Sequence, residues 1–131
     1  MTDQDEVEEQ GFRMEDLRSG SPYAFSDFFL YSFPGFFSFA DFLLHDKLSA
    51  KNATAGAFFQ LWPKLRDFDS PEQIKAFLYT AIRDNCLDYL KYLQVDPLAK
   101  AYSPQLQFAA SLPPGILQDL LSFTERFEPG Q

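Results

Sequence analysis

The stretch SPEQIKAFLYTAIRDNCLDYLKYL, residues 70–93, decides how this chain folds. It opens with Ser70, Pro71 and Gln73, the pattern of an N-cap, a proline at the first helical position and the amide of a capping box. Apolar residues then recur at helical spacing and share one wide face: Ile74, Phe77, Leu78, Ala81, Ile82, Tyr89 and Leu93. We therefore predict one long, largely packed helix over residues 71–93.

The opposite stripe of this helix is polar and leaves two interpretations open. It carries Thr80, Arg83, Leu87 and Lys91, with Asp84 beside them. In the first interpretation these residues are a solvated surface, and the nearby aromatic side chains belong to the core. In the second, the cations and aromatic rings form a surface that touches nucleic acid.

Three more helices are expected before this one. Ser21 and Pro22 predict the start of a helix over residues 22–33, and Pro34-Gly35 predicts a break after it. A second helix is predicted over residues 35–45, ending at His45. A third is predicted over residues 49–65, with a possible kink at its proline.

The fold class that follows is all-α. We expect a compact bundle of three to four helices over residues 17–93, after an acidic disordered tail over residues 1–16. Residues 94–131 are expected to form a linker and the start of a second helical region, with a short helix over 114–127. The predicted core consists of Phe25, Phe28, Phe39, Phe58, Trp62, Phe77 and Leu78.

Composition limits the classes of protein to consider. The 131 residues suffice for one domain, and 46% are hydrophobic. Cys86 is the single cysteine, so no internal disulfide can form, which fits a reducing cytoplasm. The acidic N-terminus lacks the apolar run of a signal peptide, and polar residues interrupt the longest apolar stretch. We expect a cytoplasmic protein without membrane insertion.

Catalytic and metal-binding patterns are missing from the sequence. The single histidine, His45, stands at a predicted helix end and has no Cys or second His to complete a site. Asp84 and Asp88 are one turn apart on the predicted helix. Two carboxylates are too few ligands for a metal site. We expect no enzyme, no cofactor, no metal and no small-molecule substrate.

Charge argues against nucleic-acid binding through bulk electrostatics. The formal net charge is −8, and the first twenty residues hold seven acids and two arginines. The rest of the chain is also acidic, so it has no basic footprint. A local cationic patch remains possible.

Four segments, in this order and spacing, resemble region 2 of the bacterial extracytoplasmic-function (ECF) sigma factors of RNA polymerase. They are LRSGSPYAF (17–25), FSFADFLL (37–44), AFFQLW (57–62) and IKAFLYTAIRDNCLDYLKY (74–92). The resemblance implies a helical domain that initiates transcription by docking on core RNA polymerase and reading the −10 promoter element as a melted single strand. Aromatic stacking and cationic backbone contacts are the physics of such binding.

The resemblance also implies two sets of contact residues. The set implied for promoter DNA is Arg66, Phe68, Lys75, Tyr79, Arg83 and Lys91. The set implied for core RNA polymerase is Lys51, Asn52, Ala55, Gly56 and Phe59.

The chain departs from the family pattern in three places. In AKNATAGAFFQLW, residues 50–62, the acids and glutamine that grip the polymerase are replaced. Asp84 stands at the family's Asn position and Asn85 at a basic one, which should weaken DNA binding. The family's second DNA-binding region is matched only at its opening, by residues 111–123. The alternative is therefore a sigma-like interaction module that binds a regulator, such as an anti-sigma factor, without promoter recognition.

Overall fold

The computed structural model describes residues 13–98 and 106–129, which form helices joined by short loops, with no strand among them. The all-α prediction is confirmed. The elements in chain order are α2 (Met14–Arg18), α3 (Pro22–Leu44), α4 (Lys47–Leu61), the 3₁₀ helix η1 (Trp62–Asp67), α5 (Pro71–Val95), the 3₁₀ helix η2 (Leu106–Ala109) and α6 (Pro114–Arg126).

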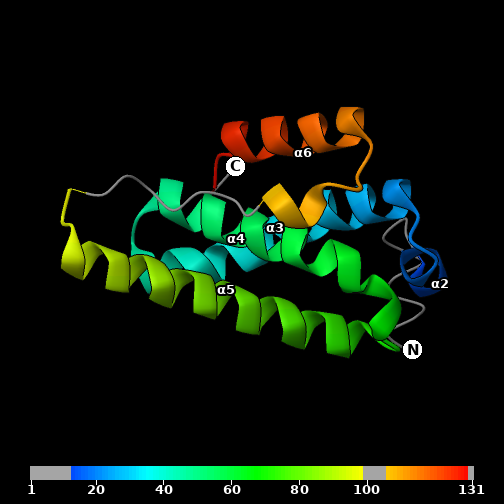
Figure 1. The fold of residues 1–131 in the computed structure, drawn as a ribbon, viewed down its shortest axis with the longest axis horizontal. Helices are drawn as coiled ribbons and strands as arrows, with labels where there is room; N and C mark the ends of the chain where they lie inside the picture. Colours follow the sequence, from blue (N-terminus) through cyan, green and yellow to red (C-terminus); the bar gives the residue numbers. More distant parts are fainter. Residues whose placement is uncertain (1–12, 99–105, 130–131) are drawn as a thin grey trace.

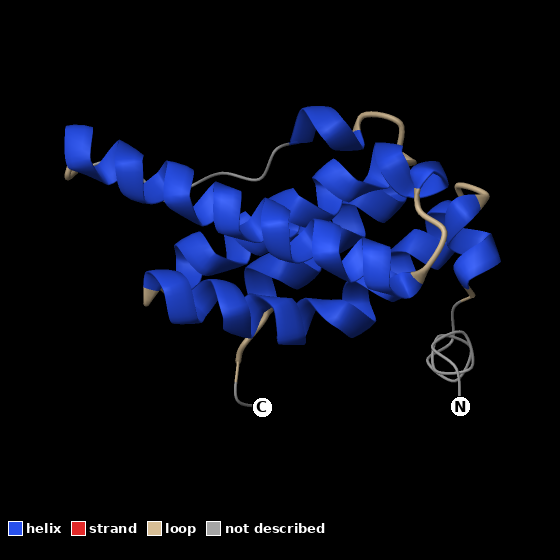
Figure 2. Cartoon of the chain, turned by 90° about the horizontal axis from the view of Figure 1, so that it is seen from below, coloured by secondary structure: helices blue, strands red, loops and turns tan. Residues whose placement is uncertain are grey.

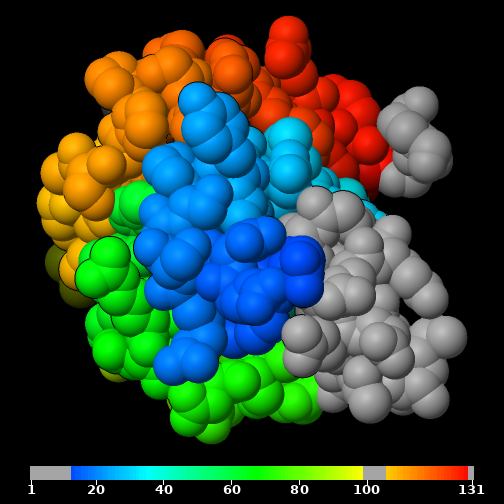
Figure 3. Space-filling model, turned by 90° about the vertical axis from the view of Figure 1, so that its right-hand side faces the viewer, coloured from blue at the N-terminus to red at the C-terminus, as the bar shows by residue number. Residues whose placement is uncertain are grey.

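Helices α3, α4 and α5 form the bundle, and each of them packs on the other two. Helix α6 lies along the side of the bundle away from α5 (Figure 1). The C-terminal end of α5 extends past the other helices (Figure 2). At the opposite end, α2 lies beside the first turns of α3, and the residues of η1 and the start of α5 lie below it (Figure 3).

Helix α3 is continuous, so the predicted break at Pro34-Gly35 is wrong. Proline at position 34 removes one backbone donor, and the carbonyl that loses its partner is that of Leu30. Leu30, Pro34 and Ser38 are all exposed, so water can satisfy this carbonyl. The Ser38 hydroxyl also donates to the Pro34 carbonyl oxygen, at 3.2 Å.

Both ends of α3 agree with the sequence. The Ser21 hydroxyl accepts a hydrogen bond from the Ala24 N–H at 3.2 Å, which confirms the predicted N-cap. The helix ends at His45, which adopts the left-handed conformation with φ of 53°. His45 is therefore a helix-end residue, as expected.

The third predicted helix is divided into two elements. Helix α4 ends at Leu61, and the chain tightens into η1, with Pro63 in its first turn. Proline cannot donate to the carbonyl four residues earlier, so the change to a 3₁₀ helix at this point has a local cause.

The start of α5 is capped almost as predicted. The Ser70 hydroxyl accepts from the Gln73 N–H at 3.3 Å. The Gln73 side chain reaches one residue further back than a standard capping box, because its oxygen accepts from the Asp69 N–H at 2.7 Å. The buried face of α5 consists of Ile74, Leu78, Ala81, Ile82, Asn85, Cys86 and Tyr89.

The core is built mainly from phenylalanines. Phe29 of α3 lies 4.8 Å from Phe58 of α4 between ring centroids, and both are fully buried. The predicted core residues Phe25, Phe28, Phe58, Trp62 and Leu78 are buried, whereas Phe39 and Phe77 are only half-buried. Aromatic pairs of this kind contribute beyond the area they bury.

The two terminal helices belong to the same packed unit. Met14 and Leu17 of α2 are buried, so the acidic segment expected to be disordered through residue 16 becomes helical at residue 14. At the other end of the chain, Phe123 of α6 packs on Phe33 at 5.5 Å and Phe127 packs on Phe37 at 5.1 Å. The aromatic core of the bundle therefore continues into α6.

Candidate functional site

Helix α5 presents two different edges, one on each side of its buried face. Lys75, Tyr79 and Arg83 are spaced by four residues and form what we call the cationic edge. Thr80, Asp84 and Asp88 have the same spacing and form the acidic edge. Because successive residues are rotated by about 100° around a helix, the two edges lie on opposite flanks of the same element.

The cationic edge is open to solvent. Lys75 and Arg83 are exposed, and Tyr79 is 46% exposed. The Tyr79 ring packs against two rings of α3, at 4.9 Å from Phe36 and 5.1 Å from Phe39. These contacts hold the ring in place while part of it remains accessible.

The two edges interact electrostatically across the outer face of the helix. Arg83 Nη2 lies 3.4 Å from Asp84 Oδ1, and both side chains are 58% exposed. A pair this exposed holds its partners weakly, so Arg83 remains available to another anion.

The remaining residues predicted to bind DNA lie away from the cationic edge. Phe68 packs on Phe77 at 5.5 Å, on the side of the acidic edge. Arg66 is exposed in η1, and its guanidinium lies beside Gly20. Lys91 is exposed but lies two turns beyond Arg83 and rotated by about 80° around the helix. The predicted set therefore does not form one surface.

The residues predicted to bind core polymerase are mostly inside the protein. Ala55, Gly56 and Phe59 are buried, so they are not available to a partner in this structure. Their surroundings include the C-terminal segment, because α4 contacts both η2 and α6. Lys51 is half-buried, and its ammonium donates to the Glu125 carbonyl oxygen at 3.1 Å. Lys51 and Asn52 alone keep some exposure.

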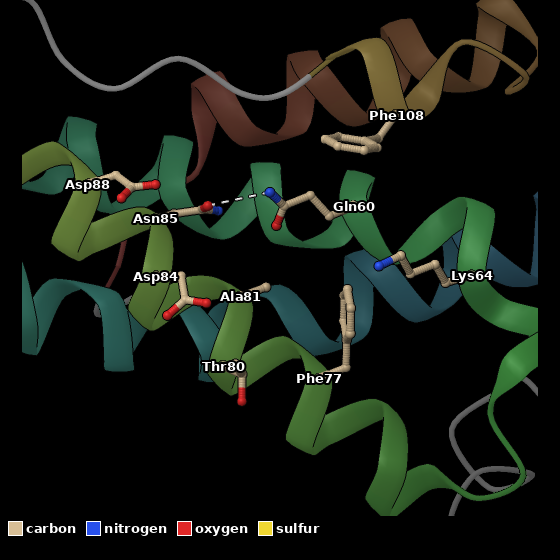
Figure 4. A pocket seen from close by; sticks show the side chains of 9 residues that line it. All are labelled: Gln60, Lys64, Phe77, Thr80, Ala81, Asp84, Asn85, Asp88 and Phe108. Atoms are coloured by element: carbon tan, nitrogen blue, oxygen red, sulfur yellow. Dashed lines mark hydrogen bonds between the residues drawn. The ribbon is translucent and has the colours of Figure 1, made fainter.

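A pocket of about 410 Å³ adjoins the acidic edge (Figure 4). Helix α5 supplies most of its lining, with additions from α4, η1 and η2. The lining residues are Gln60, Lys64, Phe77, Thr80, Ala81, Asp84, Asn85, Asp88 and Phe108. Figure 4 shows the two carboxylates toward one end and Lys64 toward the other.

Hydrogen bonds fix the polar side of this pocket. Asn85 is 2% exposed, and its Nδ2 donates to the Ala53 carbonyl oxygen at 3.1 Å. Gln60 Nε2 lies 3.5 Å from Asn85 Oδ1. Asn85 was expected only as an altered polar position of the family pattern, and its burial was not predicted. Its spacing from Ile82, Ala81 and Leu78 was the signal, because these place it in the middle of the apolar face.

The pocket also contains a cation next to an aromatic ring. Lys64 Nζ lies 5.4 Å from the centroid of the Phe77 ring, which is within the range of a cation–π contact. Phe108 of η2 supplies a second ring to the lining.

Other reactive groups are unremarkable in the described residues. Burial raises the pKa of the Cys86 thiol from 9.0 to about 11, so this thiol is protonated and inert at neutral pH. Residues 13–98 and 106–129 contain no group of three or more His, Cys, Asp or Glu side chains that could hold a metal ion. In the same ranges, no helix combines the length and apolar character that a membrane span requires.

Comparison with models of protein families, with curated protein sequences and with solved structures finds no match to this chain.

Proposed function

We propose that this chain is a transcription-factor domain, similar to region 2 of a sigma factor, that binds single-stranded promoter DNA through the cationic edge of α5. The observation that supports it best is the position of Tyr79, whose half-exposed ring is held by Phe36 and Phe39 and flanked one turn away by Lys75 and Arg83. A fixed aromatic ring between two cations suits an unpaired base and its neighbouring phosphates.

Each residue of the edge has a separate part in this proposal. A base stacks on the open part of the Tyr79 ring, which contributes about 1–3 kcal/mol in single-strand binding proteins. Lys75 and Arg83 contact phosphates on either side of it. The nearby Asp84 carboxylate opposes them, so we expect weak affinity that falls as salt rises.

The same proposal includes docking on core RNA polymerase, but through fewer of the predicted contact residues. Since Ala55, Gly56 and Phe59 are buried, docking would rely on Lys51, Asn52 and other exposed residues.

Fluorescence anisotropy tests the DNA part of the proposal. A labelled single strand carrying a −10-like sequence is titrated with the full chain over a series of salt concentrations. We expect Tyr79→Ala and Arg83→Ala to weaken binding and Asp88→Asn, the control on the other edge, to preserve it. Equal affinity of the chain and both edge variants would eliminate this surface.

A second candidate function is supported by the burial of the predicted polymerase-binding residues. The chain would then be a sigma-like module that binds a regulatory protein through exposed apolar side chains. Phe42 and Leu48, on either side of the turn between α3 and α4, are 73% and 58% exposed. Large apolar side chains at such exposure are typical of an interaction site when they occur together.

Binding to purified core RNA polymerase separates the two candidates. Salt-sensitive binding that unlabelled sigma factor competes away would support the first. No binding at micromolar concentration, together with capture of an anti-sigma factor that Phe42→Ser abolishes, would support the second.

A further inference from the structure

Helix α6 lies on the bundle as an amphipathic cover. Its apolar side chains pack on the core, whereas polar residues such as Asp119 and Glu125 are exposed. The residues on its inner face are Ile116, Leu117, Leu120, Leu121, Phe123, Thr124 and Phe127. Neither of the functions proposed above uses this contact.

The two rings of α6 pack on a row of three rings on α3. Phe123 contacts Phe29 and Phe33, at 6.3 and 5.5 Å between ring centroids. Phe127 contacts Phe33 at 5.2 Å and Phe37 at 5.1 Å. We call the row formed by Phe29, Phe33 and Phe37 the aromatic face of α3. This face accepts two aromatic side chains that are four residues, or about one turn, apart on a helix.

Little besides ring packing attaches α6 to the bundle. Only Leu120 and Thr124 of this helix are buried, and its other apolar side chains are half-buried. None of the ion pairs in residues 13–98 and 106–129 includes a residue of α6. The polar link between α6 and α4 is the hydrogen bond from Lys51 Nζ to the Glu125 carbonyl oxygen, at 3.1 Å.

Helix α6 is also poorly stabilised by its own sequence. Its N-cap position is Pro113, and no side chain caps the first turn. A helix of 13 residues without such a cap is marginal in water. Its structure therefore depends on the contact with the bundle, and we expect it to open at a lower free energy than the central helices.

Opening of α6 would uncover large aromatic side chains. Phe33 is fully buried and Phe37 is 2% exposed. Among the described residues, the Phe37 ring contacts Phe33 on its own helix and Phe127 of α6. Without α6 these rings would form a contiguous apolar patch, and such patches are typical of protein-interaction sites.

We propose that the aromatic face of α3 is a docking surface for an amphipathic helix of a partner protein, and that α6 covers it until that helix takes its place. The chemistry of the partner follows from the helix that the face already holds. It presents aromatic side chains at positions i and i+4, as Phe123 and Phe127 do, and a polar outer face. A tethered helix competes at an effective concentration in the millimolar range, so α6 suppresses weak partners.

The first experiment uses a labelled peptide of residues 111–129 as the probe and measures its binding to the full chain by fluorescence anisotropy. The double variant Phe123→Ser with Phe127→Ser should bind the peptide at least about tenfold more tightly than the unmodified chain, because it loses its tethered competitor. The matched control, Gln118→Ser with Asp119→Ser on the outer face of α6, should bind no better than the unmodified chain. A peptide that carries the two Phe→Ser changes and still binds as tightly would overturn the proposal.

Folding of the double variant is followed by circular dichroism and urea denaturation. A variant that unfolds cooperatively but binds the peptide no more tightly than the unmodified chain would overturn the proposal. Loss of cooperative unfolding would overturn it as well, because α6 would then be part of the core and not a cover.

Hydrogen exchange tests the unmodified chain without any substitution. The amides of α6 should exchange at least about tenfold faster than those of Leu78 and Ile82, which are fully buried on α5. Equally slow exchange in both helices would mean that α6 does not open by itself, and no partner could then replace it.

The nucleic-acid proposal can fail without this one. Tyr79→Ala, added to the double variant, should leave peptide binding unchanged, and the double variant should bind the −10-like single strand as the unmodified chain does. Loss of peptide binding on Tyr79→Ala would place the peptide on α5 instead of the aromatic face of α3, which would contradict the proposal.

Discussion

The two edges of α5 differ although the same helix carries them. Tyr79 and Thr80 are neighbours in the chain, yet one belongs to the cationic edge and the other lines the acidic pocket. Arg83 and Asp84 are separated in the same way. Rotation of about 100° per residue, rather than distance along the chain, decides which side chains act together. A segment that looks like one mixed-charge stretch in sequence thus places Lys75 and Arg83 on one flank and Asp84 and Asp88 on the other.

The buried face between the edges decides which way each of them points. Ile82 and Leu78 are fully buried against the bundle, which fixes the rotation of α5 and leaves one edge open on each flank. The different surroundings of the two edges therefore depend on the packing of α5.

The largest effect is expected from Ile82→Ala. Removing this fully buried side chain leaves a cavity beneath both edges, and we expect a loss of about 2–5 kcal/mol in the free energy of unfolding. Urea denaturation measures it. The matched control is Leu87→Ala on the same helix, where a 45% exposed side chain should cost no more than about 0.5 kcal/mol. Similar losses at both positions would mean that α5 is not packed in this orientation.

Tyr79→Ala should have the next largest effect, and it should act on one edge only. Loss of the stacking ring should weaken binding of a −10-like single strand by about 1–3 kcal/mol, measured by anisotropy. Tyr79→Phe keeps the contacts with Phe36 and Phe39 and should retain most of the affinity. A deficit in Tyr79→Phe as large as in Tyr79→Ala would show that the hydroxyl, not the ring, carries the interaction.

Asp84→Asn should have a smaller effect, and of the opposite sign. It removes the carboxylate 3.4 Å from Arg83, so oligonucleotide affinity should rise by about 0.2–1 kcal/mol, the range of an exposed ion pair. Anisotropy titrations of the same single strand measure this. A fall in affinity would contradict the view that Asp84 opposes phosphate binding at Arg83.

The smallest effect is expected at Cys86, which is buried on α5. Its thiol pKa is raised to about 11 by burial, whereas the unfolded thiol keeps a pKa near 9.0. The folded state therefore holds its proton longer, and this contribution to stability is present below pH 9 and is lost as the pH rises toward 11. Iodoacetamide at pH 8 should label the native chain far more slowly than the denatured chain. Rapid native labelling would place Cys86 at the surface.

The sequence predicted the helices well where local chemistry determines them. The caps at Ser21 and Ser70 and the end at His45 depend on side chains next to the helix termini, which the sequence displays directly. The break at Pro34 was predicted wrongly because local propensity cannot reveal that the affected carbonyl faces water. Helix α3 is kept whole by the burial of its phenylalanines, a tertiary effect.

The candidate site was less predictable, for a different reason. Exposure of Lys75, Tyr79 and Arg83 follows from the periodicity of α5 alone. Burial of Ala55 and Gly56 depends on other parts of the chain, including a C-terminal segment more than fifty residues away that packs on α4. Helix α4 is rich in small residues on every side, so no apolar stripe in its sequence indicates which face packs against the rest of the protein. The pocket depends on Phe108 of η2, which lies in the segment expected to form a linker and the start of a second helical region.

Trp62 connects the bundle to this C-terminal segment. Its indole N–H donates to the Ser111 hydroxyl at 2.7 Å, while its ring packs on Phe25 at 5.1 Å. The chain has a single tryptophan, so its emission spectrum is an intrinsic optical probe of one location. Release of η2 and α6 would remove the hydrogen bond and let water reach the indole, which should redden the emission before the helical circular-dichroism signal is lost. The protein thus contains its own reporter for whether its C-terminal segment leaves the bundle as a separate step.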